Sequence, residues 1–223
     1  MAHKTEDQAF STNALDKSTQ FIEKNKKIFI GVLIGIIVVI AGIYSYVNFI
    51  SKPRAEKASY LLSKGQNYFA AGNFDVALNG DNTDFRGFLD IAKRYSGTKA
   101  GNLANLYAGL SYAQKGDAKD ALTYLDKYDE KGDRLISPAV VSARGNCYAQ
   151  LGQIDKAISL LKKAAAEADN NSLSPIFLIQ AGELLESQNK TDEALKLYQE
   201  VKQKYPKAPY AESIDKYIQR VSK

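Results

Sequence analysis

Hydrophobic and polar positions divide this chain into two parts. Residues 28–50 read IFIGVLIGIIVVIAGIYSYVNFI, a run without a charged side chain. Beyond residue 51, apolar residues recur at helical spacing between polar ones, and no stretch alternates as a strand would. At about 1.5 Å of rise per residue, the uncharged run spans roughly 35 Å, which is enough to cross a bilayer core. The pattern predicts an all-α protein, with a transmembrane helix over 28–50 and a helical domain over 51–223.

Two alternatives to a membrane anchor are weaker. The core helix of a soluble protein needs a polar face, and residues 28–43 offer none. A cleaved signal peptide usually has an apolar run of only about 7–15 residues. The polar tail before the run, residues 1–27, is also long and carries acidic residues such as Glu6 and Asp16. We therefore expect the helix to be retained as an anchor.

The orientation of the anchor does not follow from its flanking charges, because both flanks are basic. Three basic residues precede the run and three follow it: Lys24, Lys26 and Lys27, then Lys52, Arg54 and Lys57. A short tail before an uncleaved span and a long folded domain after it form the layout of a signal anchor, which favours a cytoplasmic N-terminus.

Within the span, Gly31 and Gly35 have the GxxxG spacing that lets a second membrane helix approach closely. The alternative is that glycine is simply common in membrane helices.

Internal similarity is the main signal in the second part. Four segments share one pattern: GQNYFAAGNFDVAL from Gly65, GLSYAQKGDAKDAL from Gly109, GNCYAQLGQIDKAI from Gly145 and GELLESQNKTDEAL from Gly182. Each has an aromatic residue or leucine three positions after the glycine, a glycine or asparagine at seven and an alanine at twelve. This spacing predicts a helix, a tight turn and a second helix packed on the first at small residues.

These segments resemble the tetratricopeptide repeat. The resemblance implies a right-handed solenoid of four hairpins, at roughly 55–95, 100–133, 138–170 and 175–206, closed by an amphipathic capping helix at 209–221 whose Ile214, Ile218 and Val221 face inward. The first hairpin is longer than the others, and its turn-rich segment NGDNTD, residues 79–84, is expected to break the second helix.

In such a solenoid, the first helix of each hairpin lines a concave face where partner peptides usually lie. The repeat register places an apolar surface with interspersed amides on this face. Its predicted lining is Leu62, Gln66, Phe69, Leu103, Leu106, Leu110, Ser142, Asn146, Gln150, Ile176, Ile179 and Glu183. The alternative is that some of these side chains pack against the cap or the segment next to the anchor.

Composition argues against several other function classes. The 30 basic and 25 acidic residues are scattered, without the basic stripe that nucleic acid requires. His3 and Cys147 are the only histidine and the only cysteine, so no metal site, cofactor site or small-molecule catalysis is expected. We interpret Cys147 as a buried structural thiol, and the acidic cluster of Asp126, Asp129, Glu130 and Asp133 as a solvated surface.

A second resemblance lies around residues 21–62, where FIEKNKK leads into the apolar run and KPRAEKASYLL follows it. This layout is similar to the YfgM-type ancillary subunit of the Sec translocon. The resemblance implies a bacterial inner-membrane protein with a cytoplasmic N-terminus and a periplasmic repeat domain. The implied partners are the Sec translocon, a periplasmic folding factor and newly exported chains, which the domain would bind like a chaperone.

The alternative binding function is an envelope-assembly scaffold of the Tol-Pal or barrel-assembly type, whose hairpin junctions the Tyr205-Pro206 segment resembles. Those proteins are usually lipoproteins or cleaved exports, so an uncleaved span argues against this alternative.

Overall fold

The computed structural model describes residues 23–81, 83–130, 132, 134–209 and 213–222, so His3 and Asp133 lie outside it. All regular structure in these ranges is helical, which confirms the predicted all-α class. The chain forms two compact units, Met1–Arg54 and Ala55–Lys223.

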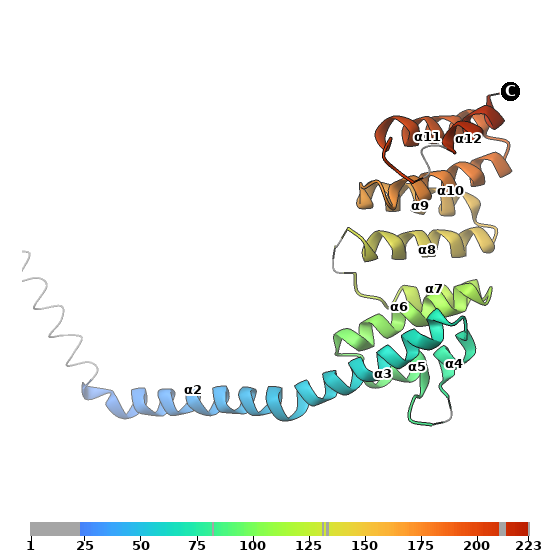
Figure 1. Ribbon diagram of the computed structural model, residues 1–223. Helices are drawn as coiled ribbons and strands as arrows, with labels where there is room; N and C mark the ends of the chain where they lie inside the picture. Colours follow the sequence, from blue (N-terminus) through green and yellow to red (C-terminus); the bar gives the residue numbers. More distant parts are fainter. Residues whose placement is uncertain (1–22, 82, 131, 133, 210–212, 223) are drawn as a thin grey trace, which may run out of the picture. The chain divides into compact units, whose positions relative to one another are not determined.

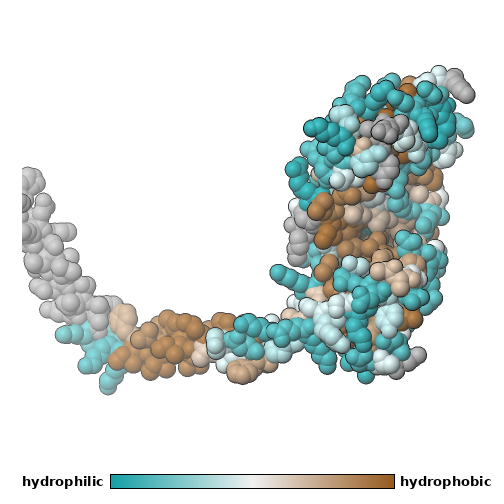
Figure 2. Space-filling model, viewed as in Figure 1, coloured by the Kyte–Doolittle hydropathy of each residue, from teal (hydrophilic) through white to brown (hydrophobic). Residues whose placement is uncertain are grey.

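Among the described residues of the first unit, helix α2 (Lys26–Tyr46) is followed by a π-helical turn (Val47–Ser51). No residue of α2 is buried, and most of its exposed side chains are large and apolar (Figure 2). The helix is long and apolar enough to span a membrane. Apart from its chain neighbours and the backbone of its own helix, a Cβ atom placed on Gly31 or Gly35 would have no described heavy atom within 4 Å.

The second unit is a stack of helical hairpins, in which the helices from α4 to α12 lie against their neighbours in chain order (Figure 1). Its helices are α3 (Lys52–Ala70, of which the first three residues belong to the first unit), α4 (Phe74–Asn79), α5 (Gly87–Arg94), α6 (Lys99–Gln114), α7 (Ala118–Leu125), α8 (Ile136–Gln150), α9 (Ile154–Ala168), α10 (Ser174–Ser187), α11 (Thr191–Lys204) and α12 (Ile214–Val221).

The turns between paired helices occur at the repeated glycine or asparagine. Gly72, Gly116, Gly152 and Asn189 have φ angles of 74°, 85°, 75° and 60°. These are left-handed values, which glycine adopts without steric cost and asparagine tolerates better than most residues. The predicted turn positions are therefore confirmed in all four hairpins.

Small residues lie where the paired helices meet. The repeated alanines, Ala77, Ala121, Ala157 and Ala194, have no exposed surface. The repeated glycines face large side chains of the partner helix: a Cβ on Gly109 would lie 2.7 Å from Leu125 Cγ, and one on Gly182 would lie 2.4 Å from Tyr198 Cε1. The predicted close approach of the paired helices is thus present.

The first hairpin departs from this arrangement, because its second helix is interrupted as predicted. Helix α4 ends at Asn79 and α5 begins at Gly87. The glycine of this hairpin, Gly65, consequently packs against α5 and the loop before it: a Cβ there would lie 2.4 Å from Phe88 Cε1 and 3.0 Å from Phe85 Cζ.

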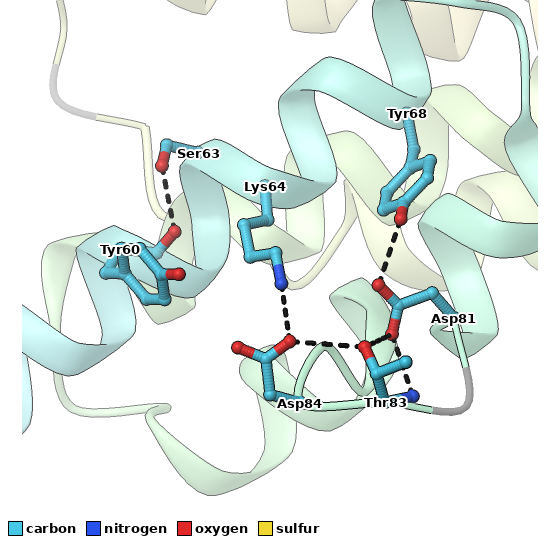
Figure 3. Close-up of polar contacts among 7 residues, drawn as sticks. All are labelled: Tyr60, Ser63, Lys64, Tyr68, Asp81, Thr83 and Asp84. Atoms are coloured by element: carbon cyan, nitrogen blue, oxygen red, sulfur yellow. Dashed lines mark hydrogen bonds and ion pairs between the residues drawn. The ribbon is translucent and has the colours of Figure 1, made fainter.

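The loop between α4 and α5 is tied to α3 by polar contacts (Figure 3). The Tyr68 hydroxyl donates to Asp81 Oδ2 at 2.9 Å, while the hydroxyl and the backbone N–H of Thr83 donate to Asp81 Oδ1 at 2.6 and 3.0 Å. Lys64 pairs with Asp84. Hydrogen bonds from Thr83 and Tyr68 lower the pKa of Asp81 to about 2.

The low pKa of Asp81 predicts an acid-sensitive contribution to stability. Because the folded-state pKa lies below the unfolded value of about 3.9, the contribution is complete above pH 4 and disappears as the pH falls through about 2. We expect Asp81→Asn to lower the thermal melting temperature at pH 6, with the difference from the original chain shrinking towards pH 2. A difference that stays constant between pH 6 and pH 2 would contradict this assignment.

The C-terminal helix α12 closes the stack. Ile214 and Val221 are buried against the last hairpin, and Ile218 packs there half-buried. Arg220 also donates to both carboxylate oxygens of Glu186 on α10, at 2.6 and 2.8 Å. We expected this helix to start at Pro209, but Pro209 lies in a turn and the helix begins at Ile214. Proline fixes its own φ and restricts the residue before it, which favours such a turn.

Candidate protein-binding surface

The twelve predicted concave-face residues lie on the first helices α3, α6, α8 and α10, but they differ in accessibility. Four are buried: Leu62, Leu106, Ser142 and Ile179. Six are half-buried: Gln66, Phe69, Leu103, Leu110, Asn146 and Ile176. Gln150 and Glu183 are exposed. The three buried apolar members belong to hydrophobic clusters of the domain itself, so their side chains already pack against other helices.

Two of the half-buried residues connect α3 to α6. Gln66 Nε2 donates to the Tyr107 hydroxyl at 3.0 Å. The Phe69 ring lies edge-on to the Tyr107 ring, with 5.4 Å between centroids. These contacts occupy the polar end of Gln66 and one edge of Phe69. The more accessible part of the predicted face therefore consists of six residues on the later first helices: Leu103, Leu110, Asn146, Gln150, Ile176 and Glu183.

Sequence reasoning missed an apolar site at the start of α8. Leu135 is 64% exposed and Ile136 is 43% exposed. Figure 2 shows apolar surface over α8 and beside α7, between more polar ends of the domain. Exposed apolar patches on soluble domains often mark interaction sites. A Leu-Ile pair after a charged turn is more readily interpreted from sequence as the buried start of a helix.

Cys147 is fully buried and free, as interpreted from the sequence. Burial raises the pKa of its thiol, so the reactive thiolate is scarce near neutral pH.

We predict that Cys147 reacts with a thiol reagent such as dithionitrobenzoate at pH 8 only as fast as the repeat domain opens. Unfolding in denaturant should raise the labelling rate at least about a hundredfold. The folded and unfolded chain would be compared by absorbance at equal reagent concentration. Equal labelling rates would show that the thiol is accessible.

The acidic cluster near the end of α7 has a structural partner. Arg144 of α8 lies 2.9 Å from Asp126 Oδ1 through Nε and pairs with Glu130 through Nη1. Arg144 Nη2 also donates to the Leu125 carbonyl at 2.6 Å. Among the residues that the structure describes, no group of three or more His, Cys, Asp or Glu side chains could hold a metal ion. The cluster thus connects two hairpins through Arg144.

A large open cavity lies beside α5, α6 and α7, and it was not predicted. Its volume is about 1330 Å³. Of the twelve predicted face residues, Leu103 lines it, together with basic side chains such as Lys93 and Lys99. The predicted break in the second helix of the first hairpin indicated a local departure from the repeat, but the size of the resulting space could not be predicted from it.

Comparison with known proteins agrees with this hairpin architecture. A family model described as the tetratricopeptide repeat-like domain matches residues 19–214. No curated protein matches the chain. Repeats of this type generally serve protein–protein interaction and are generally not enzymes. The hairpin contacts and left-handed turns described above are consistent with this family. Because the family model matches most of the chain, the chain belongs to the tetratricopeptide repeat-like domain family.

Proposed function

We propose that this protein is a membrane-anchored scaffold that binds other proteins through the first helices of its repeats. Two features of the chain support this proposal: an apolar helix with no buried residue, and a stack of hairpins that belongs to a protein-binding family. An exposed helix this apolar is stable only when hydrocarbon or another apolar surface covers it. Its tail 1–27 would be cytoplasmic and its repeat domain 51–223 periplasmic, in the bacterial inner membrane.

The proposed contact surface is the accessible part of the predicted face, Leu103, Leu110, Asn146, Gln150, Ile176 and Glu183. Half-buried leucine and isoleucine side chains offer apolar area, and the amides can pair with a partner's backbone. This composition suits extended segments of varied sequence, because backbone groups and apolar side chains are common to all exported chains. We therefore infer a translocon-associated, chaperone-like subunit, with the Sec translocon, a periplasmic folding factor and exported clients as partners.

Partner identity can be tested by crosslinking the native protein in its membrane and identifying captured proteins by mass spectrometry. Capture of translocon subunits and a periplasmic folding factor is the expected result. Capture of outer-membrane assembly or Tol-Pal proteins instead would favour the alternative scaffold function.

The orientation of the anchor can be tested with protease added to spheroplasts, which should digest the repeat domain. An intact domain would contradict the proposed orientation.

The anchor would also contact a second membrane helix through Gly31 and Gly35. Neither glycine packs against the part of this chain that the structure describes, so a neighbouring backbone could approach both. We predict that Gly31→Leu with Gly35→Leu lowers capture of membrane partners at least about threefold while membrane insertion is retained. Leu33→Phe with Ile40→Phe adds bulk on roughly the opposite side of the helix and is the matched control. An equal loss in both pairs of variants would argue against a glycine-specific contact.

A further inference from the structure

The cavity beside α5, α6 and α7 exists because the first hairpin is interrupted. The second helices α7, α9 and α11 contain 8, 15 and 14 residues, whereas α4 contains 6 and is followed by a further helix before the next hairpin begins. Chain that would continue α4 instead forms a loop and the separate helix α5. The cavity is lined by Leu78 and Asn79 at the end of α4, by one side of α5, by the start of α6 and by the end of α7.

Positive charge dominates the lining. Four basic residues, Arg86, Lys93, Lys99 and Lys127, face two acidic ones, Asp90 and Asp129. The Asp90 carboxylate is already paired with Arg94, at 2.7 Å. Lys127 lies over the Tyr124 ring, with its Nζ 4.5 Å from the centroid.

Three of these cations have no compensating partner. Throughout the ranges that the structure describes, the side chains of Arg86, Lys93 and Lys99 take part in no hydrogen bond or ion pair. Other lysines of the first two hairpins are paired: Lys64 with Asp84, and Lys115 with Asp75. Uncompensated like charges around one concave site raise the local concentration of anions and favour their binding.

The remaining lining is apolar and aromatic. Leu89 and Leu103 are half-buried, as is Tyr124, while Leu78 and Tyr128 are buried. A ligand that uses the whole site therefore needs apolar groups as well as negative charge. The volume of about 1330 Å³ exceeds the roughly 300–1,000 Å³ of most small-molecule sites, and it suits several residues of a polypeptide.

We propose that this cavity binds a segment of a partner protein in which acidic and apolar residues lie close together in sequence. Carboxylates would pair with Arg86, Lys93 and Lys99 at the rim, and apolar side chains would cover Leu89 and Leu103. The site is separate from the proposed contact surface on the later repeats, apart from Leu103. It depends neither on the identity of the membrane partners nor on the orientation of the anchor.

The test uses the full chain in a nonionic detergent at low salt, with fluorescein-labelled eight-residue peptides whose binding is followed by anisotropy. One peptide alternates Glu with Leu, a second alternates Gln with Leu, and a third alternates Glu with Ser. The Glu-Leu peptide should bind saturably, and each of the other two at least about tenfold more weakly, because each lacks one of the two required chemistries. Raising the salt concentration to 0.5 M should weaken binding of the Glu-Leu peptide.

Variants locate the binding site. Lys93→Gln with Lys99→Gln should weaken the Glu-Leu peptide about fivefold, whereas Lys162→Gln with Lys216→Gln removes the same charge from exposed positions elsewhere and should change nothing. Lys93→Glu with Lys99→Glu should reverse the preference towards a peptide that alternates Lys with Leu, which a misfolded domain could not do. The proposal is wrong if Gln-Leu binds as tightly as Glu-Leu, if both lysine pairs have equal effects, or if anionic lipid vesicles bind at this site and the peptide does not.

Discussion

Replacing Gly182 with alanine is expected to destabilise the last hairpin, although alanine is usually the better helix former. In an unhindered helix the change would gain about 0.5–1 kcal/mol. Here the new Cβ would lie 2.4 Å from Cε1 and 2.6 Å from Cζ of Tyr198. That ring is fully buried and its hydroxyl donates to Glu186, so it cannot move aside easily. Overpacking of this kind costs about 1–3 kcal/mol. We expect a net loss of about 1–2 kcal/mol in unfolding free energy.

Gly145 provides the matched control, because it occupies the same position of the preceding hairpin. A Cβ there would lie 3.2 Å from Leu161 Cγ and 3.3 Å from the Ala157 carbonyl oxygen, which is a tight but tolerable contact. Gly145→Ala should therefore change the unfolding free energy by less than about 1 kcal/mol. Urea unfolding of the full chain in detergent, followed by circular dichroism, measures both variants. Equal effects at the two glycines would contradict the packing described for Tyr198.

Replacing Arg144 with alanine is expected to weaken the junction between the second and third hairpins. The Arg144 side chain is only 17% exposed and engages Asp126, Glu130 and the Leu125 carbonyl at the end of α7. Its loss would leave these acceptors without their cation, and hydrogen bonds to charged groups contribute about 1.5–3 kcal/mol. We expect a loss of about 2 kcal/mol in the urea experiment. Arg144→Lys should recover only part of it, because lysine keeps the charge but loses the planar fork.

The comparison for Arg144 is Lys163, whose pair with Glu167 spans 3.6 Å and whose side chain is 59% exposed. Exposed pairs of this kind contribute about 0–1 kcal/mol, so Lys163→Ala should have little effect. A similar loss in both variants would mean that general surface charge, and not the junction itself, sets the stability.

The hairpin architecture could be predicted because each hairpin depends on local chemistry that a sequence displays. Gly116 and Asn189 mark left-handed turns, and Ala121 and Gly109 mark the positions where two helices touch. The helix break after Asn79 could be predicted for the same reason, since turn-forming residues cluster there.

Accessibility and long-range pairing could not be predicted as well. The repeat register placed Leu106 and Ile179 on the same face as Gln150 and Glu183, but the first two are buried in hydrophobic clusters and the last two are exposed. Nothing local to Arg144 or Glu130 indicates that they meet, because the turn between them sets their distance. The cavity beside α5 likewise depends on how α5 and α7 lie relative to each other, which no single repeat encodes.

Position-specific photocrosslinking in native membranes tests the central claim, that an anchored repeat domain binds proteins through its first helices. A photoreactive amino acid would be placed at Gln150 on α8 and at Glu183 on α10, which are exposed positions on first helices. The control positions are Lys162 on α9 and Lys196 on α11, which are exposed on second helices. Crosslinked protein partners are expected from Gln150 and Glu183, and few or none from Lys162 and Lys196. Equal crosslinking from both sets, or crosslinking from the second helices alone, would contradict the central claim.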